Sequence, residues 1–158
     1  MNDLELAKQR LLAGSLSFVL VKDGVTLCSG TREGIAELLE ASSKQGGAAH
    51  GASLADKIVG KAVAMIARAA GIRAVYTPLA SQAARDALAA DHIPLEYERL
   101  VPLVLNKRND GPCPMERLTL PIDDPLQAIA ALEEFVRSRP ATPPGRTQPA
   151  QALDRQAA

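Results

Sequence analysis

The sequence predicts a three-layer α/β/α domain with a mixed β-sheet, and three patterns along the chain carry this prediction. LSFVLV (16–21) and VTLCS (25–29) flank a Lys-Asp-Gly turn, which is typical of two antiparallel strands. A long apolar helix pattern covers residues 54–71. Residues 72–101 then read as strand, helix and strand with short connections, which is typical of a right-handed βαβ unit with parallel strands. Antiparallel and parallel pairs together make a mixed sheet.

The remaining elements each have a local signal. Apolar residues recur at helical spacing from Leu4 to Leu12, and Gly14 follows them, which predicts a first helix. Thr31 can cap a second helix, which Gly46 terminates. Within the βαβ unit we expect a strand over 72–78, a helix over 81–92 and a strand over 93–101, and after a polar loop a last helix over about 125–138.

One domain with an appended tail suits a chain of 158 residues better than two domains. Residues 1–138 contain all the predicted elements. From residue 139 onward the chain is rich in Pro, Ala and Gln and has almost no large apolar residues. We therefore expect residues 139–158 to be a disordered tail, because such a segment cannot bury enough apolar surface to fold.

The composition argues against several classes of partner. Eighteen basic residues balance eighteen acidic ones, so bulk charge does not favour nucleic acid or membrane. Aromatic residues are only 3% of the chain, which argues against stacking platforms for single strands. The N-terminal residues MNDLELAKQR lack the apolar core of a signal peptide, so we expect a cytoplasmic protein. In a reducing cytosol Cys28 and Cys113 would remain thiols.

A capping-box pattern stands at the predicted start of the apolar helix. Ser53 and Asp56 have the S-x-x-[DE] spacing, and a capping role alone can account for both residues. Two further features point to a ligand. The preceding glycine-rich loop would let an anion approach the positive helix end, and Lys57 and Lys61 lie one turn apart on an otherwise buried helix. A nucleotide phosphate would suit this arrangement, although Ala52 stands where a P-loop requires lysine.

The segment GPCPMER (111–117) is the second candidate site. Pro112 and Pro114 restrict the backbone on both sides of Cys113, which directs the thiol. Neighbouring basic residues, Arg108 among them, favour the thiolate form of a cysteine. Two interpretations stay open: a proline-framed turn with an inert thiol, and a reactive nucleophile.

The Pro-Cys pair resembles part of the zinc motif of the cytidine deaminases. In that family P-C-x-x-C supplies two zinc ligands, and H-x-E or C-x-E at the start of a central helix supplies the third ligand and the catalytic glutamate. Here Glu116 stands where the second cysteine would be, and residues 54–71 contain neither H-x-E nor C-x-E. The resemblance implies a deaminase-like fold without the zinc ligand set, and we expect no zinc and no other cofactor.

The chain resembles more closely an uncharacterised microbial family, domain of unknown function 1893. The matching stretches are LVKDG (20–24), GASLADKIVGKAVA (51–64), IPLEYERLVP (93–102) and NKRNDGPCPMER (106–117). Together they span roughly residues 5–137. This resemblance implies a deaminase-like fold with a modified pocket and supplies no activity.

The resemblance also implies that the start of the apolar helix faces the Cys-Pro-Met-Glu segment across one pocket. The candidate catalytic residues are Asp56, Lys57, Cys113 and Glu116, and the candidate ligand-binding residues are Ser53, Lys57, Lys61, Asn106 and Arg108. The first hypothesis is a protein that binds a nucleotide-like or other small anionic molecule. The second is an enzyme with Cys113 as nucleophile or redox thiol. The third is a homo-oligomeric or interaction module with a vestigial pocket.

Overall fold

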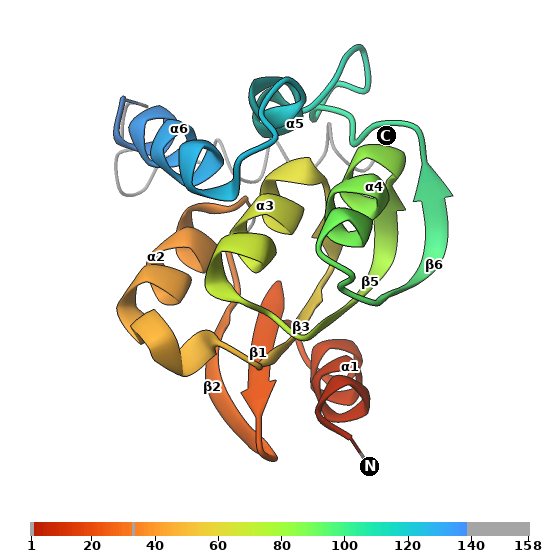
Figure 1. The fold of residues 1–158 in the computed structure, drawn as a ribbon. Coiled ribbons are helices and arrows are strands. Elements are labelled where there is room, and N and C mark those ends of the chain that lie inside the picture. The colour runs from red at the N-terminus through yellow and green to blue at the C-terminus, as the bar shows by residue number, and fades with distance from the viewer. Residues whose placement is uncertain (1, 33, 139–158) are drawn as a thin grey trace, which may run out of the picture.

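The computed structural model describes residues 2–32 and 34–138, which form a six-stranded sheet with helices on both faces (Figure 1). The predicted tail, 139–158, lies outside the described residues. The elements are α1 (Asp3–Ala13), β1 (Phe18–Lys22), β2 (Val25–Gly30), α2 (Ala36–Gln45), the 3-10 helix η1 (Gly46–Ala49), β3 (Ser53–Asp56), β4 (Ile58–Val59), α3 (Lys61–Ala70), β5 (Ala74–Ser81), α4 (Gln82–Ala90), β6 (Leu95–Val101), α5 (Pro114–Thr119) and α6 (Pro125–Ser138).

The sheet is mixed, which confirms the predicted fold class. β1 pairs antiparallel with both β2 and β3, whereas β5 pairs parallel with β3, β4 and β6. A strand has only two edges, and β6 follows one edge of β5 along its length. β3 and β4 therefore lie one after the other along the other edge of β5, and Lys57 separates them. The carboxyl ends of β4, β5 and β6 all meet at one edge of the sheet, which is where open α/β sheets bind ligands.

The predicted helix over 54–71 was wrong in its first third. Its first residues form the strand β3, and α3 begins only at Lys61, after Gly60 in an extended conformation. This short segment of small, mostly apolar residues is compatible with either a helix or a strand. As a strand, its backbone forms hydrogen-bond ladders with β1 on one side and β5 on the other. The predicted capping box is therefore wrong as well, because Ser53 lies in a strand and does not begin a helix.

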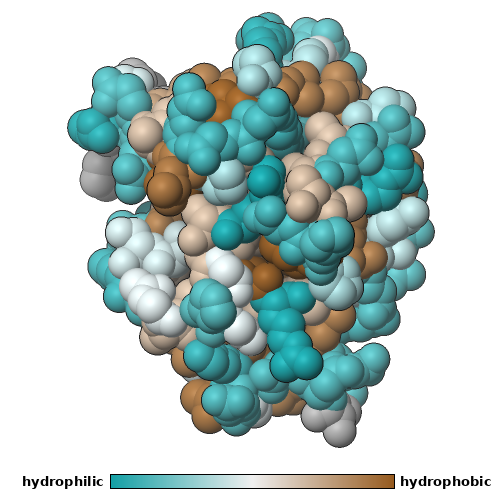
Figure 2. Space-filling view, viewed as in Figure 1, coloured by the Kyte–Doolittle hydropathy of each residue, from teal (hydrophilic) through white to brown (hydrophobic). Residues whose placement is uncertain are grey.

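Two apolar cores lie on opposite faces of the sheet. The larger core packs beneath α2, α3, α4 and α6, and Met65 and Ile66 of α3 are central to it. The smaller core lies between α1 and the other face, where Leu11 packs with Val19 and Tyr76. Figure 2 shows that the outer face over the larger core is mostly hydrophilic, with apolar side chains along its upper edge. α3 is the central helix that its apolar sequence predicted.

The polar loop after β6 contains a helix that the sequence did not predict. α5 begins at Pro114, which suits the first turn of a helix because its missing N–H needs no partner there. The last helix, α6, confirms the prediction for residues 125–138. In the described part of the chain no helix is both long and apolar enough to span a membrane.

Candidate functional site

Glu116 is a carboxylate buried at the carboxyl edge of the sheet, with only 1% of its surface exposed. Its Oε1 accepts hydrogen bonds from the Lys61 backbone amide at 2.6 Å and from Ser81 Oγ at 3.3 Å. Its Oε2 accepts one from the Val104 amide at 2.7 Å. Three donors from three separate segments therefore satisfy one carboxylate, which removes most of the cost of burying it.

Two of these donors belong to helix N-termini. Lys61 is the first residue of α3, and Ser81 is the N-cap of α4, where its Oγ also accepts a hydrogen bond from the Ala84 amide at 3.1 Å. Helix N-termini carry partial positive charge and favour anions. The anion at the start of α3 is thus the protein's own Glu116.

The Gly60 backbone approaches this carboxylate closely. A Cβ at Gly60 would lie 3.0 Å from Glu116 Oε1 and 3.2 Å from Val104 Cγ2. Only a residue without a side chain fits there unless its neighbours move.

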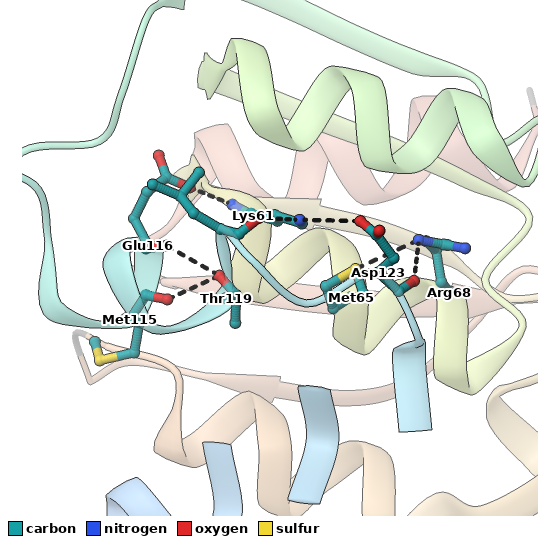
Figure 3. A network of polar contacts seen from close by, with 8 residues as sticks. Lys61, Met65, Arg68, Met115, Glu116, Thr119 and Asp123 are labelled. Atoms are coloured by element: carbon teal, nitrogen blue, oxygen red, sulfur yellow. Dashed lines mark hydrogen bonds and ion pairs between the residues drawn. The ribbon is translucent and has the colours of Figure 1, made fainter. Parts of the chain in front are cut away.

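The Lys61 side chain leaves the carboxylate and holds the connection between α5 and α6 (Figure 3). Its Nζ donates to the Leu120 carbonyl at 2.8 Å and lies 3.9 Å from Asp123 Oδ1. Two turns further along α3, Arg68 donates to the Asp123 carbonyl at 3.3 Å and pairs with Asp91 at 3.0 Å. Lys61 and Arg68, the two cations on this side of α3, are therefore both paired with carbonyl or carboxylate groups of the protein itself. Lys61, for which the sequence suggested an anionic ligand, already has these partners.

Cys113 occupies the N-cap position of α5 and is partly buried. Its amide donates to the Val104 carbonyl at 2.8 Å, and its carbonyl accepts from the Arg117 amide at 2.9 Å. This backbone hydrogen bond to Val104 places the loop that follows β6 beside the start of α5. GPCPMER is therefore a proline-framed turn into a short helix that positions Glu116.

Asn106 organises the exposed loop that precedes this turn. Its Oδ1 accepts from the amides of Arg108 at 3.0 Å and Asp110 at 3.2 Å, and its Nδ2 donates to Asp110 Oδ1 at 2.8 Å. Arg108 is exposed on the same loop. The Asn106 side chain thus forms its hydrogen bonds within the loop itself.

Asp56 and Lys57 lie where β3 gives way to β4. Asp56 Oδ1 accepts from the Ile58 amide at 3.2 Å, and the Lys57 amide donates to the Ser17 carbonyl at 3.0 Å. Burial raises the pKa of the Asp56 carboxyl to about 8, against the opposing effect of backbone hydrogen bonds from Ile58 and Lys57. Asp56 is therefore largely protonated at neutral pH, and Lys57 carries the charge at this strand break.

A hollow of about 410 Å³ opens beside Lys57, between the C-terminal end of α1 and the sheet. Its lining residues are Leu11, Leu12, Gly14, Lys57 and Pro78. Across residues 2–32 and 34–138, no hydrogen bond or ion pair engages the Lys57 ammonium group. A cation beside an apolar hollow can attract an anion.

The structure groups some of the predicted site residues and leaves others apart. It joins Glu116 to the start of α3 at Lys61, as the resemblance implied, although that start lies eight positions after Ser53, which is buried within β3. Asp56 and Lys57 mark the strand break, and Asn106 and Arg108 belong to an exposed loop. The catalytic and ligand-binding roles assigned to these residues stay predictions.

Three residues of the Glu116 site were not identified from the sequence: Gly60, Ser81 and Val104. Only Ser81 had a readable signal, because a serine directly before a helical stretch is a typical N-cap. Val104 contributes a backbone amide and Gly60 contributes the space left by its missing side chain, and no side-chain pattern reveals either.

The residues present do not fit a zinc site of the deaminase type. The described parts of the chain contain no group of three or more His, Cys, Asp or Glu side chains placed to hold a metal ion. Glu116, which stands where the motif needs a second cysteine, has both oxygens committed to hydrogen bonds.

The comparisons with known proteins identify a family and a fold. Residues 6–136 match the family described as Domain of unknown function (DUF1893). A crystal structure of a DUF1893 family protein from Thermotoga maritima aligns with a TM-score of 0.77 and 23% sequence identity, covering 85% of this chain and 90% of that one. No curated protein matches the chain.

Proposed function

The chain belongs to the DUF1893 family, and we propose that it binds a small anionic molecule without zinc chemistry. The observation that carries this proposal is the Lys57 ammonium group beside a hollow of about 410 Å³, with no acidic partner among residues 2–32 and 34–138. Pockets of this size accept small ligands, and a single well-placed charge orients them.

The contacts of the other candidate cations favour Lys57 for this role. The ammonium group of Lys61 donates to the Leu120 carbonyl, and the helix end beside it is filled by Glu116. An external anion at the start of α3 would have to displace that buried carboxylate. Arg108 lies on an exposed loop and is not among the residues that line the hollow. We therefore propose that the ligand binds at the break between β3 and β4, beside Lys57, and not at the N-terminus of α3.

We also propose that the family shares its architecture with the cytidine deaminases and has lost their zinc. In support, an antiparallel hairpin (β1 and β2) precedes parallel strands joined through helices (β3, β5 and β6). Glu116, which accepts hydrogen bonds from the protein itself, would then stand in place of a zinc-ligating cysteine. This relationship rests on arrangement and motif alone, and it assigns no reaction.

A thermal-shift experiment with a panel of nucleotides, phosphates and organic acids tests the binding proposal. A ligand that binds the folded chain raises its unfolding temperature, because binding stabilises the native state by mass action. Lys57→Gln removes the charge and should abolish that shift. Lys44→Gln is the matched control: Lys44 lines a different hollow, between α2 and α6, and pairs with Glu40 at 3.0 Å.

The proposal fails if no member of the panel stabilises the chain at millimolar concentration. It also fails if Lys57→Gln and Lys44→Gln reduce the shift equally, since the effect would then reflect net charge rather than one site. Lys57→Arg should keep most of the shift, because it keeps the cation.

A further inference from the structure

We infer that the hollow at Lys57 binds an amphipathic organic monoanion, that is, a carboxylate on a short aliphatic body. This inference rests on the proposed function and specifies its ligand class. It follows from the walls of the hollow, from the number of cations that reach it, and from the burial of Tyr76 in the smaller core.

The walls of the hollow are apolar apart from Lys57. Leu11 is 1% exposed and joins the smaller core, whereas Leu12 is 59% exposed although leucine gains from burial. Pro78 comes from β5 and Gly14 from the end of α1. An aliphatic body lying against Leu12 and Pro78 would remove this apolar surface from water.

A single positive charge reaches the hollow from the described residues that line it. The other cations of α1 are engaged elsewhere: Lys8 pairs with Glu96 at 2.6 Å, and Arg10 donates to Thr26 and to the Gly24 carbonyl. A polyphosphate carries several charges and is typically held by several cations or by a cradle of backbone amides. One ammonium group matches one carboxylate.

Tyr76, the aromatic residue that packs with Leu11 in the smaller core, is not available for a nucleobase. Tyr76 is 1% exposed beneath α1, its hydroxyl donates to Glu98 at 3.0 Å, and the Lys8 ammonium lies 4.8 Å from its ring centre. Base recognition commonly uses an exposed aromatic face. The hollow therefore suits an aliphatic body better than a base.

Gly14 lines the hollow, and a substitution there adds bulk to its wall without straining the fold. Its φ of −125° and ψ of −170° are extended and suit a β-branched residue. A Cβ there would lie 3.8 Å from the Arg10 carbonyl oxygen and 3.9 Å from Leu16 Cγ, which are ordinary contacts. Gly14→Val should therefore occupy the hollow and leave the chain folded.

The test titrates the full chain with hexanoate, with hexanol as its neutral counterpart and with ATP, and follows backbone amide signals by NMR. We expect hexanoate to shift the signals of residues around the hollow and to bind at least about tenfold more tightly than hexanol, because only the acid pairs with Lys57. Lys57→Gln and Gly14→Val should each weaken hexanoate binding by about tenfold or more, and Lys44→Gln should leave it unchanged. Unfolding midpoints of the unliganded variants confirm that they fold.

The outcomes separate this inference from the proposed function. ATP binding at Lys57 without hexanoate binding would overturn the ligand class and leave the anion-binding function standing. Binding of neither ligand, nor of any other anion in the panel, would overturn both. Hexanoate binding that survives both Lys57→Gln and Gly14→Val would overturn the location.

Discussion

Glu116 Oε1 accepts a 2.6 Å hydrogen bond from the backbone amide of Lys61, and this contact joins α5 to the first residue of α3 across 55 positions of sequence. The carboxylate does for α3 what an N-cap side chain does for most helices. Gly60, the actual N-cap residue, makes no side-chain hydrogen bond. The side chain that caps the central helix thus comes from a segment 55 positions later in the sequence.

Replacement of Glu116 should destabilise the fold strongly. Glu116→Ala leaves the Lys61 and Val104 amides and the Ser81 hydroxyl without their acceptor, so we expect a loss of about 2–4 kcal/mol in the free energy of unfolding. Urea denaturation measures it. Glu133→Ala, on an exposed position of α6, is the control and should change stability by less than about 0.5 kcal/mol. Equal effects would contradict the capping role.

A small anion should partly restore the Glu116→Ala variant. The substitution removes a carboxylate and leaves its donors around the vacated space, so formate can take its place at the helix end. We expect formate to raise the urea midpoint of this variant more than that of the parent chain, with chloride at equal ionic strength as the control. Identical responses of both proteins would show that the donors do not form an anion site.

Gly60→Ala should destabilise the chain although its backbone conformation is open to alanine. The new methyl group would press on the Glu116 carboxylate, which three hydrogen bonds hold in place, so we expect a cost of about 1–3 kcal/mol. At Gly47 a Cβ meets no atom within 4 Å, and Gly47→Ala is the matched control. Equal unfolding midpoints for the two variants would mean that the carboxylate moves aside freely.

Asp56 should make stability depend on pH. Its pKa is about 8 in the folded chain against an ordinary value of 3.8, so the folded state retains a proton that the unfolded state releases. This contribution to stability is complete below pH 3.8 and is lost as pH rises toward about 8. Asp56→Asn keeps a neutral acceptor for the Ile58 amide and removes the titration. Relative to the parent chain, the variant should therefore gain stability from pH 5 to pH 8; parallel profiles would contradict the raised pKa.

The two thiols should differ in alkylation rate. Burial raises the pKa of Cys28, which lowers the fraction of reactive thiolate on β2. We expect iodoacetamide to modify Cys113 before Cys28 at neutral pH, as followed by mass spectrometry of Cys28→Ser and Cys113→Ser variants. If Cys113 at mildly acidic pH reacts no faster than a free thiol, the hypothesis of a catalytic cysteine is rejected.

Local pattern was sufficient for most of the elements. The hairpin of β1 and β2, the helix–strand alternation from α3 to β6 and the last helix all follow from periodicity and turn residues, which act over a few neighbouring positions. The same reasoning failed at Ser53–Asp56. That short apolar segment suits a helix or a strand, and the choice came from β1 and β5 on its two edges.

By itself, the sequence determined the α/β class and the central position of the apolar helix, and it pointed to Glu116 and Lys57 as candidate site residues. Only the tertiary structure decided what surrounds these two side chains. Glu116 meets backbone amides and a serine hydroxyl from three distant segments, and backbone donors leave no mark in a sequence pattern. Lys57 emerges at a strand break beside α1, because the sheet order places β3 and β5 next to each other under that helix.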